Sequence, residues 1–180
     1  MNKLNIFTDG GARGNPGPAA IGVLVKAETG PVLVKISRKI GVTTNNVAEY
    51  SAVVEALEWL IKNKEIISRS SGISQLDRGS STLSGHDAVR LTNSSTASEQ
   101  STNHPTNKNN NQEIHFHLDS TLVVNQLNGL FKIKNGKLQE LLFKIKQLEQ
   151  DVNTPIYYSY IPREKITVAD QLVNQALDNV

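Results

Sequence analysis

The sequence contains no cysteine, so disulfide bonds, zinc fingers and cysteine nucleophiles are excluded, and a reducing compartment is compatible. It also lacks any run of about 18 consecutive apolar residues. We therefore expect neither a signal peptide nor a membrane-spanning helix, and we predict a cytoplasmic protein. The net charge of +2 is too small to indicate nucleic-acid binding by itself.

Hydrophobic residues are scarce: they make up 38% of the 180 residues, below the roughly 45–50% of an ordinary globular chain. The deficit lies between about residues 63 and 112, a stretch rich in Ser, Thr and Asn that contains no Phe, Trp or Tyr. It shows no period of a strand or a helix. We predict one domain over residues 1–180, interrupted at about 63–112 by a disordered insertion.

The flanking segments have clear strand and helix patterns. Before the insertion, apolar runs predict three strands joined by turns, with Gly10–Pro18 as the first turn and Glu28–Pro31 as a hairpin turn. A helix capped by Thr43 or Thr44 follows. After the insertion we expect strands at 114–118 and 155–160 and helices at 123–127, 138–148 and 169–177. This order predicts an α/β fold whose mixed sheet has helices on its faces.

Four carboxylates occupy chemically suggestive positions. Asp9 and Asp119 are expected to close strands, Glu49 to lie in the first turn of a helix, and Asp170 to begin the last helix. If the first and fourth strands are parallel neighbours, Asp9 and Asp119 lie side by side. Converging carboxylates need a divalent cation to offset their charge, and oxygen ligands favour Mg²⁺ or Mn²⁺. Taken singly, each is better explained as a turn former or a helix-dipole partner, and it is their joint placement that indicates a site.

The motifs that carry these carboxylates resemble those of ribonuclease H, type I. They cover nearly all of the chain outside the insertion and occur in the family's order: Thr8-Asp9-Gly10-Gly11-Ala12-Arg13-Gly14-Asn15-Pro16-Gly17-Pro18, Thr44-Asn45-Asn46-Val47-Ala48-Glu49-Tyr50, Leu118-Asp119-Ser120 and Ala169-Asp170. The resemblance implies a ribonuclease H-like fold with a five-stranded mixed sheet, in which three strands are antiparallel and two are parallel.

The same resemblance implies an activity. Asp9, Glu49, Asp119 and Asp170 would hold two Mg²⁺ ions, or Mn²⁺, and the enzyme would hydrolyse the RNA strand of RNA/DNA hybrids to leave a 5′-phosphate and a 3′-hydroxyl. Double-stranded RNA is a second candidate substrate. We expect a monomer.

Polar and flexible residues of the motifs are candidate substrate contacts. Glycines let a backbone approach a nucleic-acid strand, and Asn side chains can bond base edges and sugars in the wide minor groove. The alternatives are a tight turn, helix capping and, for the arginine, a solvated loop charge. The candidates are Gly10, Gly11, Arg13, Asn15, Thr44, Asn45 and Asn46.

The chain departs from the family in two loops. No basic protrusion fits in the connection 129–136, so Phe131 and Lys132 are candidate substrate contacts, with a core position as the alternative for Phe131. Before Asp170, where several members have a His, this chain has Arg163 and Glu164, and we predict that one or the other takes over part of its task.

Other functions stay open. A ribonuclease H-like binding module without useful activity is one, although the complete acidic motifs oppose it. Another two-metal nuclease of the same fold, such as a transposase or a Holliday-junction resolvase, is a second, because fold alone does not determine substrate. His115 and His117 are expected to be structural, since oxygen-rich magnesium sites seldom include imidazole.

Overall fold

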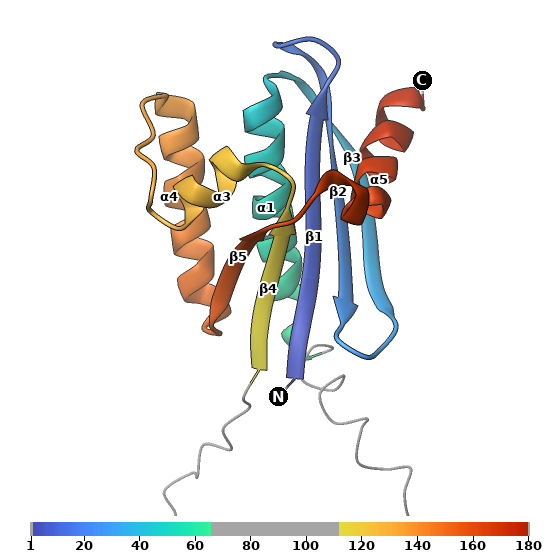
Figure 1. The fold of residues 1–180 in the computed structure, drawn as a ribbon, viewed down its shortest axis with the longest axis vertical. Coiled ribbons are helices and arrows are strands. Elements are labelled where there is room, and N and C mark those ends of the chain that lie inside the picture. Colours follow the sequence, from blue (N-terminus) through green and yellow to red (C-terminus); the bar gives the residue numbers. More distant parts are fainter. Residues whose placement is uncertain (1, 66–111, 180) are drawn as a thin grey trace, which may run out of the picture.

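The computed structural model describes residues 2–65 and 112–179 (Figure 1). The predicted insertion falls almost wholly on residues 66–111, outside the described residues. None of the helices within the two described ranges is both long and apolar enough to span a bilayer. The elements are β1 (Asn2–Ala12), β2 (Gly17–Ala27), β3 (Val32–Thr43), α1 (Asn45–Lys62), β4 (Gln112–Leu118), α3 (Thr121–Leu127), α4 (Gly136–Val152), β5 (Ile156–Tyr160), η2 (Arg163–Lys165) and α5 (Thr167–Asp178).

One five-stranded sheet runs through the molecule in the order β3-β2-β1-β4-β5. The pairs β1–β2 and β2–β3 are antiparallel, whereas β1–β4 and β4–β5 are parallel. Helices α1 and α4 cover one face, and α5 lies over β1, β2 and β3 on the other (Figure 1). The predicted mixed sheet with helices on both faces is therefore confirmed.

The main core lies between the sheet and the pair α1 and α4. Alternate residues of β1, β2 and β4 point to this side because successive side chains of a strand face opposite ways. They pack against the buried stripe of α1 and against the apolar face of α4 that the sequence predicts. The central members are Leu4, Ile6, Val23, Val25, Ile114, Phe116, Tyr50, Val53, Leu57, Leu138 and Ile145.

Strand β1 is longer than the sequence suggests. We expected Asp9 to close it, but pairing with β2 continues to Ala12↔Ala19, so Asp9 lies inside the strand and the turn shrinks to residues 13–16. Pairing with the parallel neighbour β4 stops earlier, at Phe7↔His117. Asp9 therefore sits where one neighbour has ended and the other continues, which leaves its side chain beside an open edge.

The start of α1 also differs in detail. The helix begins at Asn45, with Thr44 as its cap, so Glu49 lies one turn further in than expected. The Thr44 side chain accepts a hydrogen bond from the Val47 amide at 3.5 Å. Ser120 caps α3 in the same way, accepting from the Val123 amide at 3.4 Å. Both capping predictions hold, and Glu49 is too far along α1 to act as a partner of its N-terminal dipole.

Two glycines let helices approach the sheet at backbone distance. A Cβ on Gly10 of β1 would lie 2.2 Å from the Ala48 carbonyl carbon and 2.3 Å from the Glu49 nitrogen of α1. A Cβ on Gly22 of β2 would lie 2.1 Å from the Ala169 carbonyl oxygen of α5. Each contact is directly beside a carboxylate-bearing residue, so these glycines set how closely Glu49 and Asp170 approach the sheet.

This close packing predicts that Gly10→Ala is strongly destabilising. The added methyl must push the α1 backbone away, and we expect a loss of about 2 kcal/mol or more in the free energy of unfolding, measured by urea denaturation. Gly136→Ala is the matched control: Gly136 opens α4, is exposed, and has no atom within 4 Å of its added Cβ. That variant should change stability by less than about 0.5 kcal/mol. Equal losses in the two variants would contradict the close-packing argument.

Candidate active site

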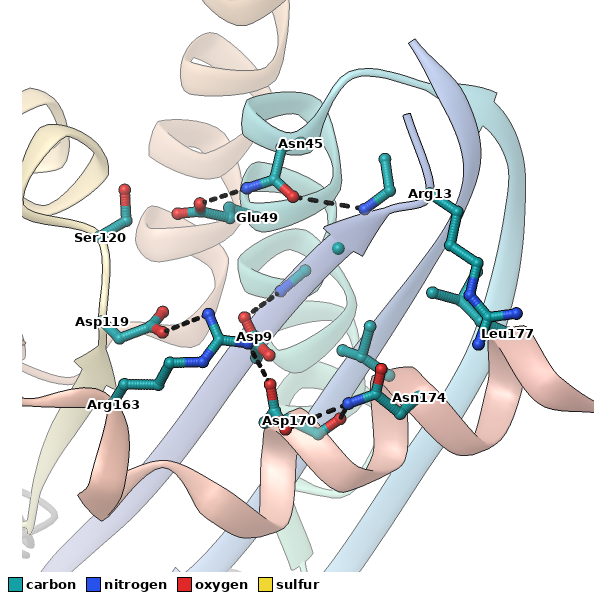
Figure 2. A pocket seen from close by; sticks show the side chains of 14 residues that line it. Asp9, Arg13, Asn45, Glu49, Asp119, Ser120, Arg163, Asp170, Asn174 and Leu177 are labelled. Carbon is teal, nitrogen blue, oxygen red and sulfur yellow. Dashed lines mark hydrogen bonds and ion pairs between the residues drawn. The ribbon is translucent and has the colours of Figure 1, made fainter. Parts of the chain in front are cut away.

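Four carboxylates from four separate segments line one open pocket of about 340 Å³ (Figure 2). Asp9 lies in β1 and Glu49 in α1, Asp119 directly follows β4, and Asp170 lies in the first turn of α5. The parallel register brings two of them together, because continuing it by two residues past Phe7↔His117 places Asp9 opposite Asp119. The predicted convergence of Asp9 and Asp119 follows from this pairing.

Asp9 is the most buried of the four, with 7% of its surface exposed. Burial first, and then the charges of Asp119 and Asp170, raise its pKa to about 6. The charge of Arg163 and a hydrogen bond from the Gly10 amide to Asp9 Oδ1, 2.9 Å long, act in the opposite direction. The carboxylate is thus held in an environment that disfavours its charged form.

The surroundings of Glu49 also disfavour its charged form. Burial first, and then the charges of Asp119 and Asp9, raise its pKa to about 7. A hydrogen bond from Ser120 and one from Asn45 lower it. The Asn45 Nδ2 atom donates to Glu49 Oε1 at 3.0 Å, so the carboxylate is oriented from two sides.

Arg163 is the cation that meets these carboxylates. Its Nη1 atom lies 3.6 Å from Asp119 Oδ2, and its Nη2 atom donates to Asp170 Oδ1 (Figure 2). The predicted auxiliary residue Arg163 therefore lies within the site. Glu164, the other predicted auxiliary residue, is exposed and is not part of the pocket lining.

The residues present fit a divalent cation. Across residues 2–65 and 112–179, no three acidic or imidazole groups are already spaced as ligands around one ion. However, the pocket offers hard oxygens from carboxylate, amide and hydroxyl side chains, carries an excess of negative charge, and already attracts a guanidinium. Oxygen donors of this kind suit Mg²⁺ or Mn²⁺ better than zinc.

The polar residues predicted as substrate contacts fall into two groups. Gly10, Gly11, Arg13 and Asn45 line the pocket. The other three, Asn15, Thr44 and Asn46, do not line it in the structure.

Several of these side chains already have partners inside the protein. Asn45 Oδ1 accepts from the Ala12 amide at 3.3 Å, and Asn15 Oδ1 accepts from the Asn45 amide at 3.1 Å. Arg13 forms an exposed ion pair with Asp178. The two asparagines thus join the β1–β2 turn to the start of α1 and fix the position of Glu49.

The connection between α3 and α4 is short and carries no helix, as the sequence predicts. Phe131 is 52% exposed there, so the alternative that places it in the core is wrong. Lys132 is exposed beside it. Both residues lie outside the pocket that holds the carboxylates.

His115 and His117 lie on β4 and contact other side chains of the sheet. His115 Nε2 lies 3.1 Å from Glu113 Oε2, and the ring stacks on Tyr157. His117 Nε2 lies 3.0 Å from Asn5 Oδ1. Neither lines the carboxylate pocket, in agreement with the structural role predicted for them.

Two residues of the site carry roles that sequence reasoning missed. Ser120 was expected only to cap a helix, yet it also hydrogen-bonds Glu49. Asn174 donates to Asp170 Oδ2 at 3.1 Å from one turn along α5. The spacing of four residues was the available signal for the Asp170–Asn174 pair, because such residues are neighbours on a helix surface.

Comparison with known proteins identifies the family. The family profile described as RNase H matches residues 1–177. The chain belongs to the RNase H family. Ribonucleases named HI or H1 among its relatives and structural neighbours assign it to type I.

Two relatives, one of them in two solved structures, show how far this RNase H resembles known ones. It is 31% identical over 177 residues to the bifunctional protein Rv2228c of Mycobacterium tuberculosis, covering 98% of this chain but 36% of the relative. LC11-RNase H1, isolated from compost by a metagenomic approach, is 36% identical, with 99% of this chain and 97% of that chain covered and a TM-score of 0.68. LC11-RNase H1 in complex with an RNA/DNA hybrid is 34% identical, with 97% and 96% covered and a TM-score of 0.66.

The raised pKa values of Asp9 and Glu49 predict how the metal-free RNase H responds to pH. An acid whose folded pKa exceeds its unfolded value binds more protons when folded, so stability falls as pH rises between the two values. The window runs from 3.8 to about 6 for Asp9 and from 4.5 to about 7 for Glu49. In EDTA, Asp9→Asn should therefore be more stable than the wild type at pH 8, by on the order of 2 kcal/mol, and similar to it at pH 4.

The control for this measurement is Asp151→Asn, because Asp151 is exposed on α4. Its unfolding free energy should follow the wild-type curve from pH 4 to pH 8. If the Asp9→Asn curve also runs parallel to the wild-type curve, Asp9 is not held at a raised pKa.

Proposed function

We propose that this RNase H is an endoribonuclease that hydrolyses the RNA strand of RNA/DNA hybrids with two divalent metal ions, leaving a 5′-phosphate and a 3′-hydroxyl. The observation that carries the proposal is the convergence of Asp9, Glu49, Asp119 and Asp170, from four separate segments, on one pocket. The similarity to LC11-RNase H1, solved with an RNA/DNA hybrid, supports the choice of substrate.

The four carboxylates are the groups that would hold the ions. Bound there, Mg²⁺ or Mn²⁺ would activate a water molecule and stabilise the leaving oxygen of the phosphodiester. The chain's own residues orient the ligands: Asn45 and Ser120 hold Glu49, Asn174 holds Asp170, and the Gly10 amide holds Asp9. Such fixed hydrogen bonds keep the ligand geometry ready before substrate arrives.

Contacts to the hybrid would extend from the pocket onto the surrounding surface of the protein. Gly11 and Arg13 line the pocket and would meet the RNA strand, while Asn15, Thr44, Asn45 and Asn46 lie at the turn and the adjacent start of α1. A ring and an ammonium group on one short loop, Phe131 and Lys132, would add a sugar contact and a phosphate contact. All four carboxylates belong to one chain, so we propose that a monomer suffices.

A binding module without activity is the less favoured function. Such a module has no need of clustered carboxylates whose burial, and then their mutual repulsion, raises their pKa values, and Asp9 and Glu49 are both of this kind. Double-stranded RNA differs from the hybrid in one strand only. Whether the protein also cleaves it is decided by the experiment below.

The proposal is tested by incubating the protein with labelled RNA/DNA, RNA/RNA and DNA/DNA duplexes in Mg²⁺, Mn²⁺ or EDTA. We expect RNA cleavage in the hybrid with either ion, none in EDTA, and none with DNA/DNA. Asp9→Asn should lower the cleavage rate by about a hundredfold or more, because a metal ligand is lost. Asp151→Asn should cleave at the wild-type rate.

Three results would contradict the proposal. Cleavage that survives EDTA or Asp9→Asn would exclude the metal-dependent assignment. Equal cutting of DNA/DNA would exclude the hybrid as the specific substrate. Binding of the hybrid without cleavage under every metal condition would favour the inactive module.

A further inference from the structure

Arg163 occupies an unusual position for an exposed side chain. It opens the short turn η2, between β5 and α5, and its guanidinium points back into the carboxylate pocket (Figure 2). One nitrogen faces Asp119 and another donates to Asp170, so a single cation joins the end of β4 to the start of α5.

The other cationic residue that lines the pocket does not pair with these carboxylates. Among the described residues that line it, the cationic ones are Arg13 and Arg163. Arg13 pairs with Asp178 instead. The charge of Arg163 also reaches Asp9, whose pKa it lowers.

We propose that Arg163 is an exchangeable counter-ion: its guanidinium pairs with Asp119 and Asp170 in the metal-free protein and leaves when a divalent cation binds these carboxylates. The inference rests on the proposed function in one respect, namely that the carboxylates bind the ion. It adds that the chain carries its own competitor for that ion.

The competition follows from shared carboxylates. Arg163 uses Asp119 Oδ2 and Asp170 Oδ1, and an ion held between these residues needs oxygens of the same two groups. A guanidinium and a divalent cation at that place also repel each other. Metal binding must therefore either displace the guanidinium or take place against its charge.

The side chain is free to leave. It is 71% exposed, so ion pairs rather than packing hold it in place. The next anchor of the loop, Ile166, is fully buried and keeps η2 attached to the body. The guanidinium can thus swing into solvent by side-chain rotation, and the core and the backbone of η2 stay where they are.

Two measurable consequences follow. Removing the guanidinium should tighten metal binding, because both the competition and the repulsion disappear. It should also destabilise the metal-free protein, because Asp119 and Asp170 lose the charge that offsets them. Metal bound at saturation supplies that charge again, so the loss of stability should then disappear.

The test is a Mn²⁺ titration without substrate, in which EPR reports the free ion, on the wild type, Arg163→Ala, Arg163→Lys and Lys165→Ala. We expect Arg163→Ala to bind Mn²⁺ about tenfold more tightly than the wild type, which corresponds to ~1.4 kcal/mol. Arg163→Lys keeps the charge and should lie closer to the wild type. Lys165→Ala, a matched loss of charge from the same turn without a carboxylate partner, should bind as the wild type does.

Thermal unfolding of the same four proteins provides the second readout. In EDTA, Arg163→Ala should melt at a lower temperature than Lys165→Ala, and saturating Mn²⁺ should remove the difference. Equal or weaker Mn²⁺ binding by Arg163→Ala would overturn the counter-ion role while leaving the metal site intact. Absence of Mn²⁺ binding in every variant would overturn the proposed metal-dependent function and the counter-ion role together.

Discussion

Mutual repulsion among four carboxylates is the constraint on which the rest of this structure depends. Asp9, Glu49, Asp119 and Asp170 share one pocket, and burial withdraws two of them from water. Such an arrangement lowers stability unless a cation is present. The chain keeps it nevertheless, with the guanidinium of Arg163 set against Asp119 and Asp170. The clustered carboxylates therefore lower stability locally, and the proposed chemistry of the site needs this concentrated negative charge.

The fold holds the carboxylates together through backbone contacts that no side chain could replace. Gly10 and Gly22 let α1 and α5 approach the sheet from its two faces, and the residues at those contacts adjoin Glu49 and Asp170. The parallel pairing of β1 with β4 brings Asp119 beside Asp9. Core packing behind α1 then fixes the helix along its length. The geometry of the site is thus a property of how rigid elements meet and depends little on flexible loops.

Much of this was predictable from the sequence, because the order of strands and helices and the motifs around each carboxylate are local patterns. The position of Asp9 inside β1 was not, since it depends on two neighbouring strands ending at different places. The contact between Ser120 and Glu49 joins residues far apart in the chain, and only the assembled sheet brings them together. The reach of Arg163 to Asp119 is of the same kind. Exposure of Phe131 could not be decided from its hydrophobicity, because a short connection leaves an aromatic side chain no core to enter.

The central claim is that ions held by the four carboxylates contact the phosphate that is cut. Phosphorothioate substitution tests this directly: one non-bridging oxygen at a single scissile position of the RNA strand is replaced by sulfur. Sulfur is a poor ligand for Mg²⁺ and a better one for softer ions. We expect that one thio-isomer is cleaved slowly in Mg²⁺ and that Mn²⁺ or Cd²⁺ restores much of the rate relative to the oxygen substrate. Slow cleavage of both isomers to the same extent in every metal would contradict a direct contact between ion and phosphate.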